Sequence, residues 1–142
     1  MRLILILGVI IMGSVSCGEK IFTGDVNCEE CYTEKPDNVD LIIHVTINSE
    51  FPEVPIVIYS GNIEDNQVIQ VDTVYESPYY SYVAAGRRYS VKAKYEKDDA
   101  TLFAVDGTKP KVLRVTDACD SECYVIEDVT LDVRIKKSFL DF

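Results

Sequence analysis

Apolar and polar residues alternate along most of this chain with a period of two, and this pattern limits the fold more than any other feature. In residues 39–47 nearly every second residue is apolar, and the alternation is most regular in residues 89–95. A period of two is typical of a β-strand with one buried face, because successive side chains of a strand point to opposite faces of its sheet. Further short runs between turn residues predict strands at 54–58, 68–74, 79–84, 102–105, 111–116 and 129–135.

These seven to eight short strands predict an all-β fold with little or no helix. Regular short strands separated by turn signals are typical of a single antiparallel β-sandwich. The chain has 142 residues, which leaves little room for a second domain, and no repeat or interior linker divides it. We therefore expect one β-sandwich domain over residues 39–137, followed by a C-terminal tail over 138–142.

One pair of predicted strands resembles part of a known family of modules. Tyr89, Val91, Ala93 and Tyr95 alternate with polar residues, and a polar turn then leads into residues 102–107. This hairpin resembles that of transthyretin-like and carboxypeptidase-regulatory-like sandwiches, which are Ig-like modules common in bacterial surface lipoproteins. The chain after residue 16 is also similar in style to small uncharacterised bacterial lipoproteins. The resemblance implies an Ig-like or transthyretin-like sandwich, and it brings no catalytic residues with it.

The first sixteen residues form a separate unit of the sequence. Arg2 precedes an apolar run over residues 3–12, and Gly13 and two serines follow. An apolar helix of this length spans roughly 15 Å, about half of the hydrocarbon core of a bilayer, so it is too short to cross a membrane. A positive start, a short apolar stretch and small residues predict a secretory signal peptide over residues 1–16.

Cys17 directly follows this predicted signal peptide. Its placement resembles the bacterial lipoprotein signal, in which the cysteine becomes the lipidated first residue of the mature protein. That family usually has Leu three residues before the cysteine where this chain has Ser14, so secretion without a lipid is the alternative. Residues 17–38 would then hold the lipidated cysteine, a tether and the first cysteine pair. By resemblance to lipoprotein sorting rules, Gly18 in place of Asp favours the outer membrane, facing the periplasm or the cell surface.

The charge of the chain limits its partners. Fourteen basic residues stand against 24 acidic ones, which gives a formal net charge of −10. A surface of this sign repels phosphate backbones, so we expect no nucleic-acid partner. Charge alone would not hold the chain on an anionic membrane either, so we expect membrane contact through a lipid anchor.

The remaining four cysteines form the only group of residues with chemical content. Cys28 and Cys31 are separated by two residues, Cys119 and Cys123 by three, and each spacer contains two carboxylates. Two structural disulfides, a zinc site of four thiolates, and a redox-active thiol pair are the three interpretations. Nearby carboxylates raise thiol pKa values and add to the cost of an anionic zinc–thiolate centre, whereas a disulfide carries no charge. We therefore expect disulfides, with zinc as the alternative cofactor.

Four cysteines can pair in three ways. Pairing across the two clusters, for example Cys28 with Cys123, would close a loop of roughly ninety residues and restrict the unfolded chain by about 4–5 kcal/mol. Pairing within each cluster would close very short loops and stabilise the fold far less. We therefore favour pairing across the clusters.

His44 is the only histidine of the chain. It occupies an outward position of the run 39–47, where a solvated strand face is the simplest interpretation. No second histidine is available for a histidine-rich metal site, and the spacing pairs no serine or cysteine with it. We therefore predict no catalytic residue, and no metal site apart from the zinc alternative.

Four tyrosines form the densest aromatic patch of the sequence: Tyr75, Tyr79, Tyr80 and Tyr82. Tyr80 and Tyr82 share one face of their predicted strand, whereas Tyr79 points to the other. The functional interpretation of this pair is a ligand platform that stacks on a sugar or a peptide, and the alternative is ordinary strand packing. The chain contains no tryptophan, which weakens a carbohydrate-binding interpretation.

Together these features predict an exported, lipid-anchored β-sandwich that acts as a non-enzymatic structural, adhesive or interaction module with a protein or glycan partner. One alternative is a zinc-binding or thiol-dependent exported protein that uses the four clustered cysteines. Another is a glycan-binding accessory lipoprotein that uses the tyrosines. We expect no enzyme, because the sequence shows no pair of nucleophile and base.

Overall fold

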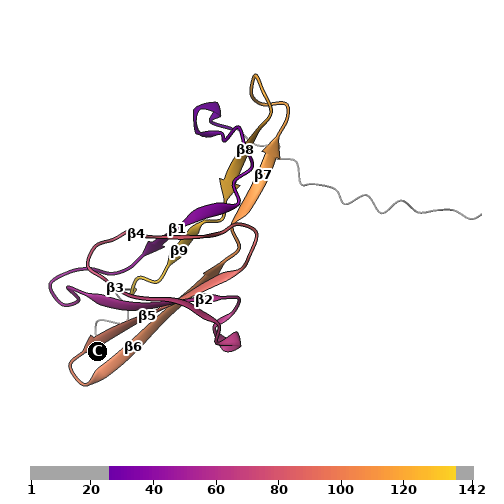
Figure 1. Cartoon of the computed structure of the whole chain (residues 1–142). Helices are drawn as coiled ribbons and strands as arrows, with labels where there is room; N and C mark the ends of the chain where they lie inside the picture. Colours follow the sequence, from indigo (N-terminus) through magenta and orange to yellow (C-terminus); the bar gives the residue numbers. More distant parts are fainter. Residues whose placement is uncertain (1–25, 137–142) are drawn as a thin grey trace, which may run out of the picture.

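The computed structural model describes residues 26–136 (Figure 1). The predicted signal peptide, Cys17, most of the tether and the predicted C-terminal tail lie outside the described residues, so these expectations stay predictions. In the described part of the chain, no helix has the length and apolar character needed to cross a membrane.

The all-β fold class is confirmed, since residues 26–136 contain no α-helix and only two short 3-10 turns, η1 (Cys28–Glu30) and η2 (Ile63–Asp65). This part of the chain contains nine strands, one more than the upper number expected from the sequence. They are β1 (Asn38–His44), β2 (Val54–Ser60), β3 (Val68–Val74), β4 (Tyr79–Ala84), β5 (Tyr89–Lys97), β6 (Ala100–Thr108), β7 (Lys111–Val115), β8 (Cys123–Glu127) and β9 (Thr130–Asp132).

The strands form three separate sheets rather than one plain antiparallel arrangement. The first has three strands in the order β4-β1-β9, the second has four in the order β3-β2-β5-β6, and β7 and β8 pair by themselves. All pairs are antiparallel except β1 and β9, which run parallel over Ile42–His44 and Thr130–Asp132. Neither this parallel pair nor the third sheet could be predicted, because alternation indicates which face of a strand is buried and not which strand lies beside it.

The three-stranded and four-stranded sheets share one hydrophobic core. Its members include Leu41 and Ile43 from β1, Ile56 and Ile58 from β2, and Val91 from β5, all with no exposed surface. In Figure 1 the two sheets lie as layers one above the other. The alternation seen in the sequence therefore decides which side of each central strand faces the other sheet.

Tyr95 of β5 places its hydroxyl inside this core. The side chain is 1% exposed, and its ring meets the ring of Phe51 edge-on with centroids 5.3 Å apart. The hydroxyl accepts a hydrogen bond from the Thr46 amide at 3.0 Å and donates one to the Val133 carbonyl at 2.7 Å. Tyr95 thus links the four-stranded sheet to the segments that follow β1 and β9.

A second group of hydrogen bonds joins side chains of β3 in one sheet to side chains of β4 in the other. The Tyr79 hydroxyl donates to the Asp72 carboxylate at 2.6 Å and accepts from the Gln70 side-chain amide at 2.6 Å. Gln70 in turn accepts from the hydroxyl of the buried Ser81 at 2.7 Å. Burial and the Asp72 carboxylate raise the pKa of Tyr79 to about 12. Side chains therefore join these two edge strands although their backbones do not pair.

Replacing Tyr95 by Phe should lower the free energy of unfolding by about 1–3 kcal/mol, because the part-buried Thr46 amide and the buried Val133 carbonyl lose their shared partner. Urea denaturation measures this directly. The matched control is Tyr80→Phe, whose side chain is 59% exposed, and it should change stability by less than about 0.5 kcal/mol. Equal effects of the two substitutions would contradict the structural role given to the Tyr95 hydroxyl.

Candidate functional site

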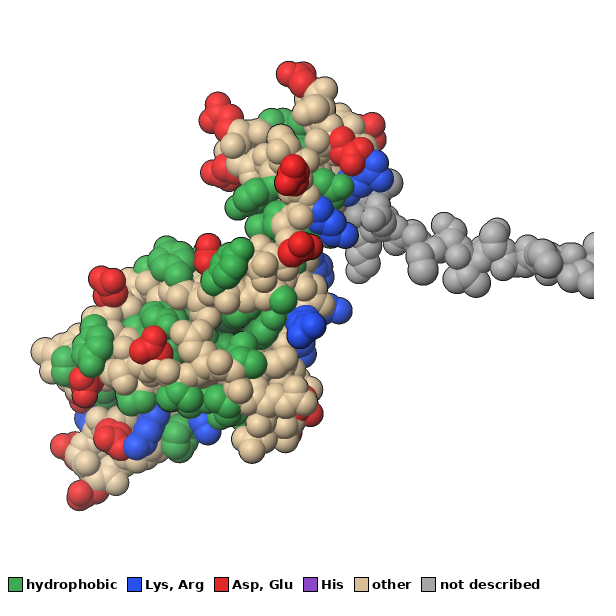
Figure 2. All heavy atoms as spheres, in the orientation of Figure 1, with side chains coloured by type: hydrophobic (Ala, Val, Ile, Leu, Met, Phe, Trp, Pro, Cys, Tyr) green, Lys and Arg blue, Asp and Glu red, His purple; other side chains and the backbone are tan. Residues whose placement is uncertain are grey.

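The β7–β8 hairpin and residues 26–32 form an arm that projects from the two larger sheets. In Figure 1 it lies apart from the layered sheets, and Figure 2 shows it as a separate lobe with many acidic side chains. Val112 of β7 and Ile126 of β8 pack against the shared core and anchor the base of the arm. Toward the tip, Val115 lies opposite Cys123 in the last pair of the ladder.

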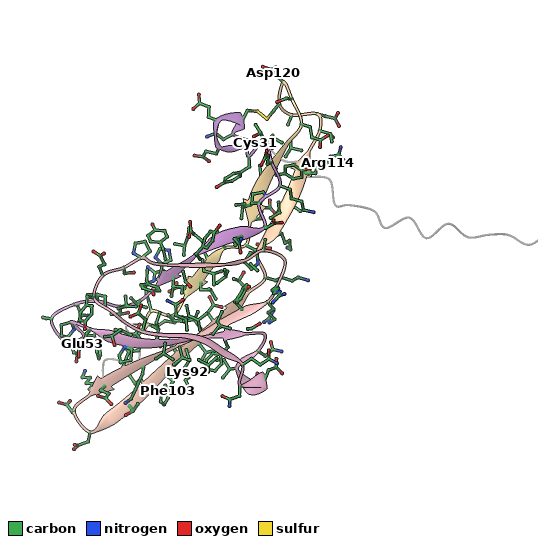
Figure 3. All side chains as sticks on the ribbon, in the orientation of Figure 1. Cys31, Glu53, Lys92, Phe103, Arg114 and Asp120 are labelled. Atoms are coloured by element: carbon green, nitrogen blue, oxygen red, sulfur yellow. A yellow bond between two sulfur atoms is a disulfide. The ribbon has the colours of Figure 1, made fainter. Side chains whose placement is uncertain are left out.

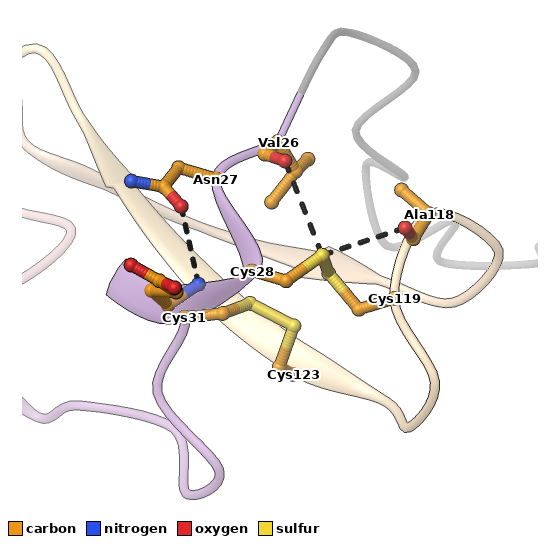
Figure 4. Close-up of a disulfide and its surroundings, with 8 residues drawn as sticks. Val26, Asn27, Cys28, Cys31, Ala118, Cys119 and Cys123 are labelled. Carbon is orange, nitrogen blue, oxygen red and sulfur yellow. Dashed lines mark hydrogen bonds between the residues drawn. A yellow bond between two sulfur atoms is a disulfide. The ribbon is translucent and has the colours of Figure 1, made fainter.

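Two disulfides hold the N-terminal part of the arm to the hairpin (Figures 3 and 4). Cys28 is bonded to Cys119 with Cα atoms 5.7 Å apart, and Cys31 is bonded to Cys123 with Cα atoms 5.6 Å apart. Pairing across the two clusters is therefore confirmed. The pair given as an example, Cys28 with Cys123, is wrong. The first cysteine of one cluster bonds to the first cysteine of the other, and the second bonds to the second.

Local structure explains which cysteines meet. Tyr32 and Tyr124 exchange backbone hydrogen bonds of 2.9 and 2.8 Å, and this bridge brings the neighbouring Cys31 and Cys123 together. The η1 turn begins at Cys28 and is capped by the Asn27 side chain, which accepts from the Glu29 amide at 3.2 Å (Figure 4). The turn sets Cys28 beside the loop that carries Cys119.

The four sulfur atoms are close together, but they are bonded in pairs. The Sγ atoms of Cys31, Cys119 and Cys123 all lie within 4.8 Å of one another, a spacing that would suit a metal site. Zinc binds the thiolate form of cysteine, so the zinc alternative would require both disulfides to be reduced first. Two disulfides instead indicate an oxidising environment outside the cytoplasm.

The tyrosine pair singled out in the sequence lies on the outward face of the three-stranded sheet. Tyr80 is 59% exposed and Tyr82 is 71% exposed, while Tyr79 points inward to its hydrogen bonds. In the neighbouring β1, Ile42 lies opposite Tyr80 and Asp40 lies opposite Tyr82. The structure thus brings two exposed rings, one apolar side chain and one carboxylate onto one face, whereas Tyr75 lies in the turn after β3.

His44 lies at the end of β1, half-buried on the outward side of the strand, opposite Asp132 of β9. Asp132 is paired with Arg134 at 2.7 Å. The hydrogen bond from Arg134 is the main cause that lowers the pKa of Asp132 to about 2, and His44 contributes a small part. Within residues 26–136, no hydrogen bond joins His44 to a serine or a cysteine.

A second exposed surface was missed in the sequence and lies on the outward face of the four-stranded sheet. Val71 of β3, Phe103 and Val105 of β6 are all more than half exposed. The Lys92 ammonium lies over this face, 5.4 Å from the centroid of the Phe103 ring (Figure 3). The sequence signal of this surface is residues 102–105, which are four apolar residues in a row. A strand with one solvent-exposed face is expected to have polar residues at two of these positions.

Comparison with protein-family models, with curated proteins and with solved structures found no match to this chain. The described residues establish a mostly-β protein with three small sheets and two disulfides.

The two disulfides should stabilise the fold in a strongly non-additive way. Alone, either bridge closes a loop of 91 or 92 residues, which the chain-entropy model values at about 4.6 kcal/mol. With one bridge present, the other closes only a small ring. This ring contains the three residue steps from Cys28 to Cys31 and the four from Cys119 to Cys123. The same model values its closure at about 2.5 kcal/mol.

Removing one bridge, by Cys28→Ala with Cys119→Ala or by Cys31→Ala with Cys123→Ala, should therefore lower the free energy of unfolding by about 2.5 kcal/mol. Removing both should lower it by about 7 kcal/mol. Denaturant unfolding without reductant measures these values, and non-reducing peptide mapping checks the pairing. Single removals that each cost as much as half of the double removal would contradict the nested arrangement.

Proposed function

We propose that this chain is an exported, lipid-anchored β-sandwich that acts as a non-enzymatic interaction module. The observation that carries the proposal is the outward display of large aromatic and apolar side chains on both main sheets, with Tyr80 and Tyr82 on one and Phe103 and Val105 on the other. Singly exposed apolar residues are ordinary on protein surfaces, but grouped ones mark binding surfaces.

An Ig-like or transthyretin-like sandwich is the fold proposed for the two larger sheets. Their shared core and their layered arrangement support it, since each buries the inward-facing residues of its strands against the other. The β7–β8 arm is then an addition to the sandwich rather than part of it.

Anchoring of the chain through a lipid on Cys17 is proposed from the sequence and agrees with the disulfides, which need an oxidising compartment. Val26 is nine residues after Cys17, so an extended tether would reach at most about 30 Å. The module would therefore work close to a membrane surface, which we propose is that of the outer membrane, facing the periplasm or the cell exterior.

A glycan partner is the second candidate, and the tyrosine face favours it. Tyr80 and Tyr82 are two residues apart on one strand, so both exposed rings belong to the same face of the sheet. The neighbouring Asp40 offers a carboxylate that can accept hydrogen bonds from sugar hydroxyls. Aromatic faces with a few polar groups beside them suit a carbohydrate ring as well as a peptide.

Replacing Cys17 by Ala in the full-length gene should release the protein from the membrane fraction into the soluble fraction. The wild-type protein should carry acyl chains on Cys17, which mass spectrometry of the N-terminal peptide detects. Cys28→Ala with Cys119→Ala serves as the control, since it removes cysteines without touching the anchor. A wild-type protein without acyl chains would contradict the anchor and leave the interaction surface open to separate tests.

The double substitution Tyr80→Ala with Tyr82→Ala should weaken binding on a glycan array by about 5- to 150-fold if the partner is a glycan, because stacking contributes about 0.5–1.5 kcal/mol per ring beyond the buried area. The matched control is Tyr75→Ala with Phe103→Ala, which removes two exposed rings elsewhere. Loss of glycan binding in the control alone would contradict the tyrosine face. Binding of a protein partner that fails only in the control would favour the four-stranded face.

A further inference from the structure

A groove of about 380 Å³ lies where the arm joins the two larger sheets. It is bordered by Gly86 after β4, by Pro110 between β6 and β7, and by both strands of the arm. Figure 2 shows basic side chains gathered at this junction. Four of its nine lining residues are basic and none is acidic: Lys35, Lys109, Lys111 and Arg114.

This concentration of positive charge is unusual for a chain whose formal net charge is −10. The basic residues come from two parts of the sequence, Lys35 from the segment before β1 and the others from residues 109–114. Only the fold brings them together. The groove volume falls within the roughly 300–1,000 Å³ of small-molecule sites in proteins.

A backbone hydrogen bond and a buried proline form one side of the groove. The Gly86 amide donates to the Pro110 carbonyl at 3.0 Å, and Gly86 adopts φ +75°, a conformation that favours glycine. Pro110 is fully buried. Lys35 lies four residues after Cys31 of the Cys31–Cys123 bridge. The backbone between Gly86 and Pro110 is therefore set by the fold before a ligand arrives, which lowers the cost of binding.

Two of the four cations are already balanced. The Lys111 ammonium is bonded to the Asp128 carboxylate, with Glu127 also nearby, and Arg114 is bonded to Glu122 at 2.5 Å. Lys35 and Lys109 are exposed, and neither takes part in the ion pairs found within residues 26–136. The four cations outnumber the three nearby carboxylates, Asp128, Glu127 and Glu122, by one, and the positive charge without a bonded carboxylate lies at Lys35 and Lys109.

We propose that this groove binds a phosphomonoester group. Such a group carries a charge of about −1.5 to −2 at neutral pH and presents three acceptor oxygens, which suits the positive charge at Lys35 and Lys109. The acidic remainder of the chain opposes the ligand at long range, but salt screens charges beyond about 8 Å at physiological ionic strength. The phosphate belongs either to a lipid headgroup or to a soluble phosphorylated molecule, and the site does not depend on the anchor at Cys17.

The test uses the full chain with Cys17→Ala, so that a lipid anchor does not contribute. Binding of inorganic phosphate is followed by NMR titration at constant ionic strength, with chloride as the competing anion. Binding to vesicles is followed by co-sedimentation with phosphatidic acid in phosphatidylcholine, against phosphatidylcholine alone. The variant is Lys35→Gln with Lys109→Gln, and the control is Lys94→Gln with Lys136→Gln, which changes the net charge equally.

The Lys35/Lys109 variant should weaken phosphate binding about tenfold or more, because hydrogen bonds to charged groups are the strong ones, and the control should change it less than about twofold. Binding to phosphatidic-acid vesicles that depends on the same lysines identifies a lipid headgroup, and phosphate binding without vesicle binding identifies a soluble ligand. An absence of both, or equal losses in variant and control, would overturn the site while leaving anchoring and the interaction surfaces unaffected.

Discussion

The rest of this molecule depends on the burial of one face of each central strand. β1, β2 and β5 each turn a row of fully buried apolar side chains toward the other sheet, and no single sheet could bury such a row alone. The outward faces are then free to vary. The base of the arm uses the same core, since Val112 and Ile126 pack against it, so even the projecting hairpin takes its position from the buried rows.

The strands themselves could be predicted where the alternation is regular. Eight of the nine strands coincide with runs seen in the sequence, and β5 does so most clearly. β8 was missed because Val125 and Ile126 are adjacent apolar residues rather than alternating ones, and because its partner β7 is short. The parallel pairing of β1 with β9 could not be foreseen, since it joins residues about ninety positions apart and a side-chain pattern is silent on strand neighbours.

Some of the surface features could likewise be predicted from the sequence, and others could not. Tyr80 and Tyr82 could be placed on one face from their spacing alone, because a two-residue step on a strand fixes the side. The exact partners of Cys28 and Cys31 could not, because loop entropy is nearly the same for either pairing across the clusters and only the Tyr32–Tyr124 bridge decides. The basic groove could not be predicted either, because it forms only where the arm, the turn after β4 and the segment before β1 come together.

The Cys28–Cys119 bond also determines how the molecule would respond to mechanical load. A pull on the N-terminus reaches Cys28 within two residues of Val26, and the covalent bridge carries it into the loop at the tip of the β7–β8 hairpin. The load therefore enters the hairpin through a covalent bond before it reaches the hydrogen bonds that join β1 to β4 and β9. A pull at that end is thus met first by the arm and only afterwards by the layered sheets.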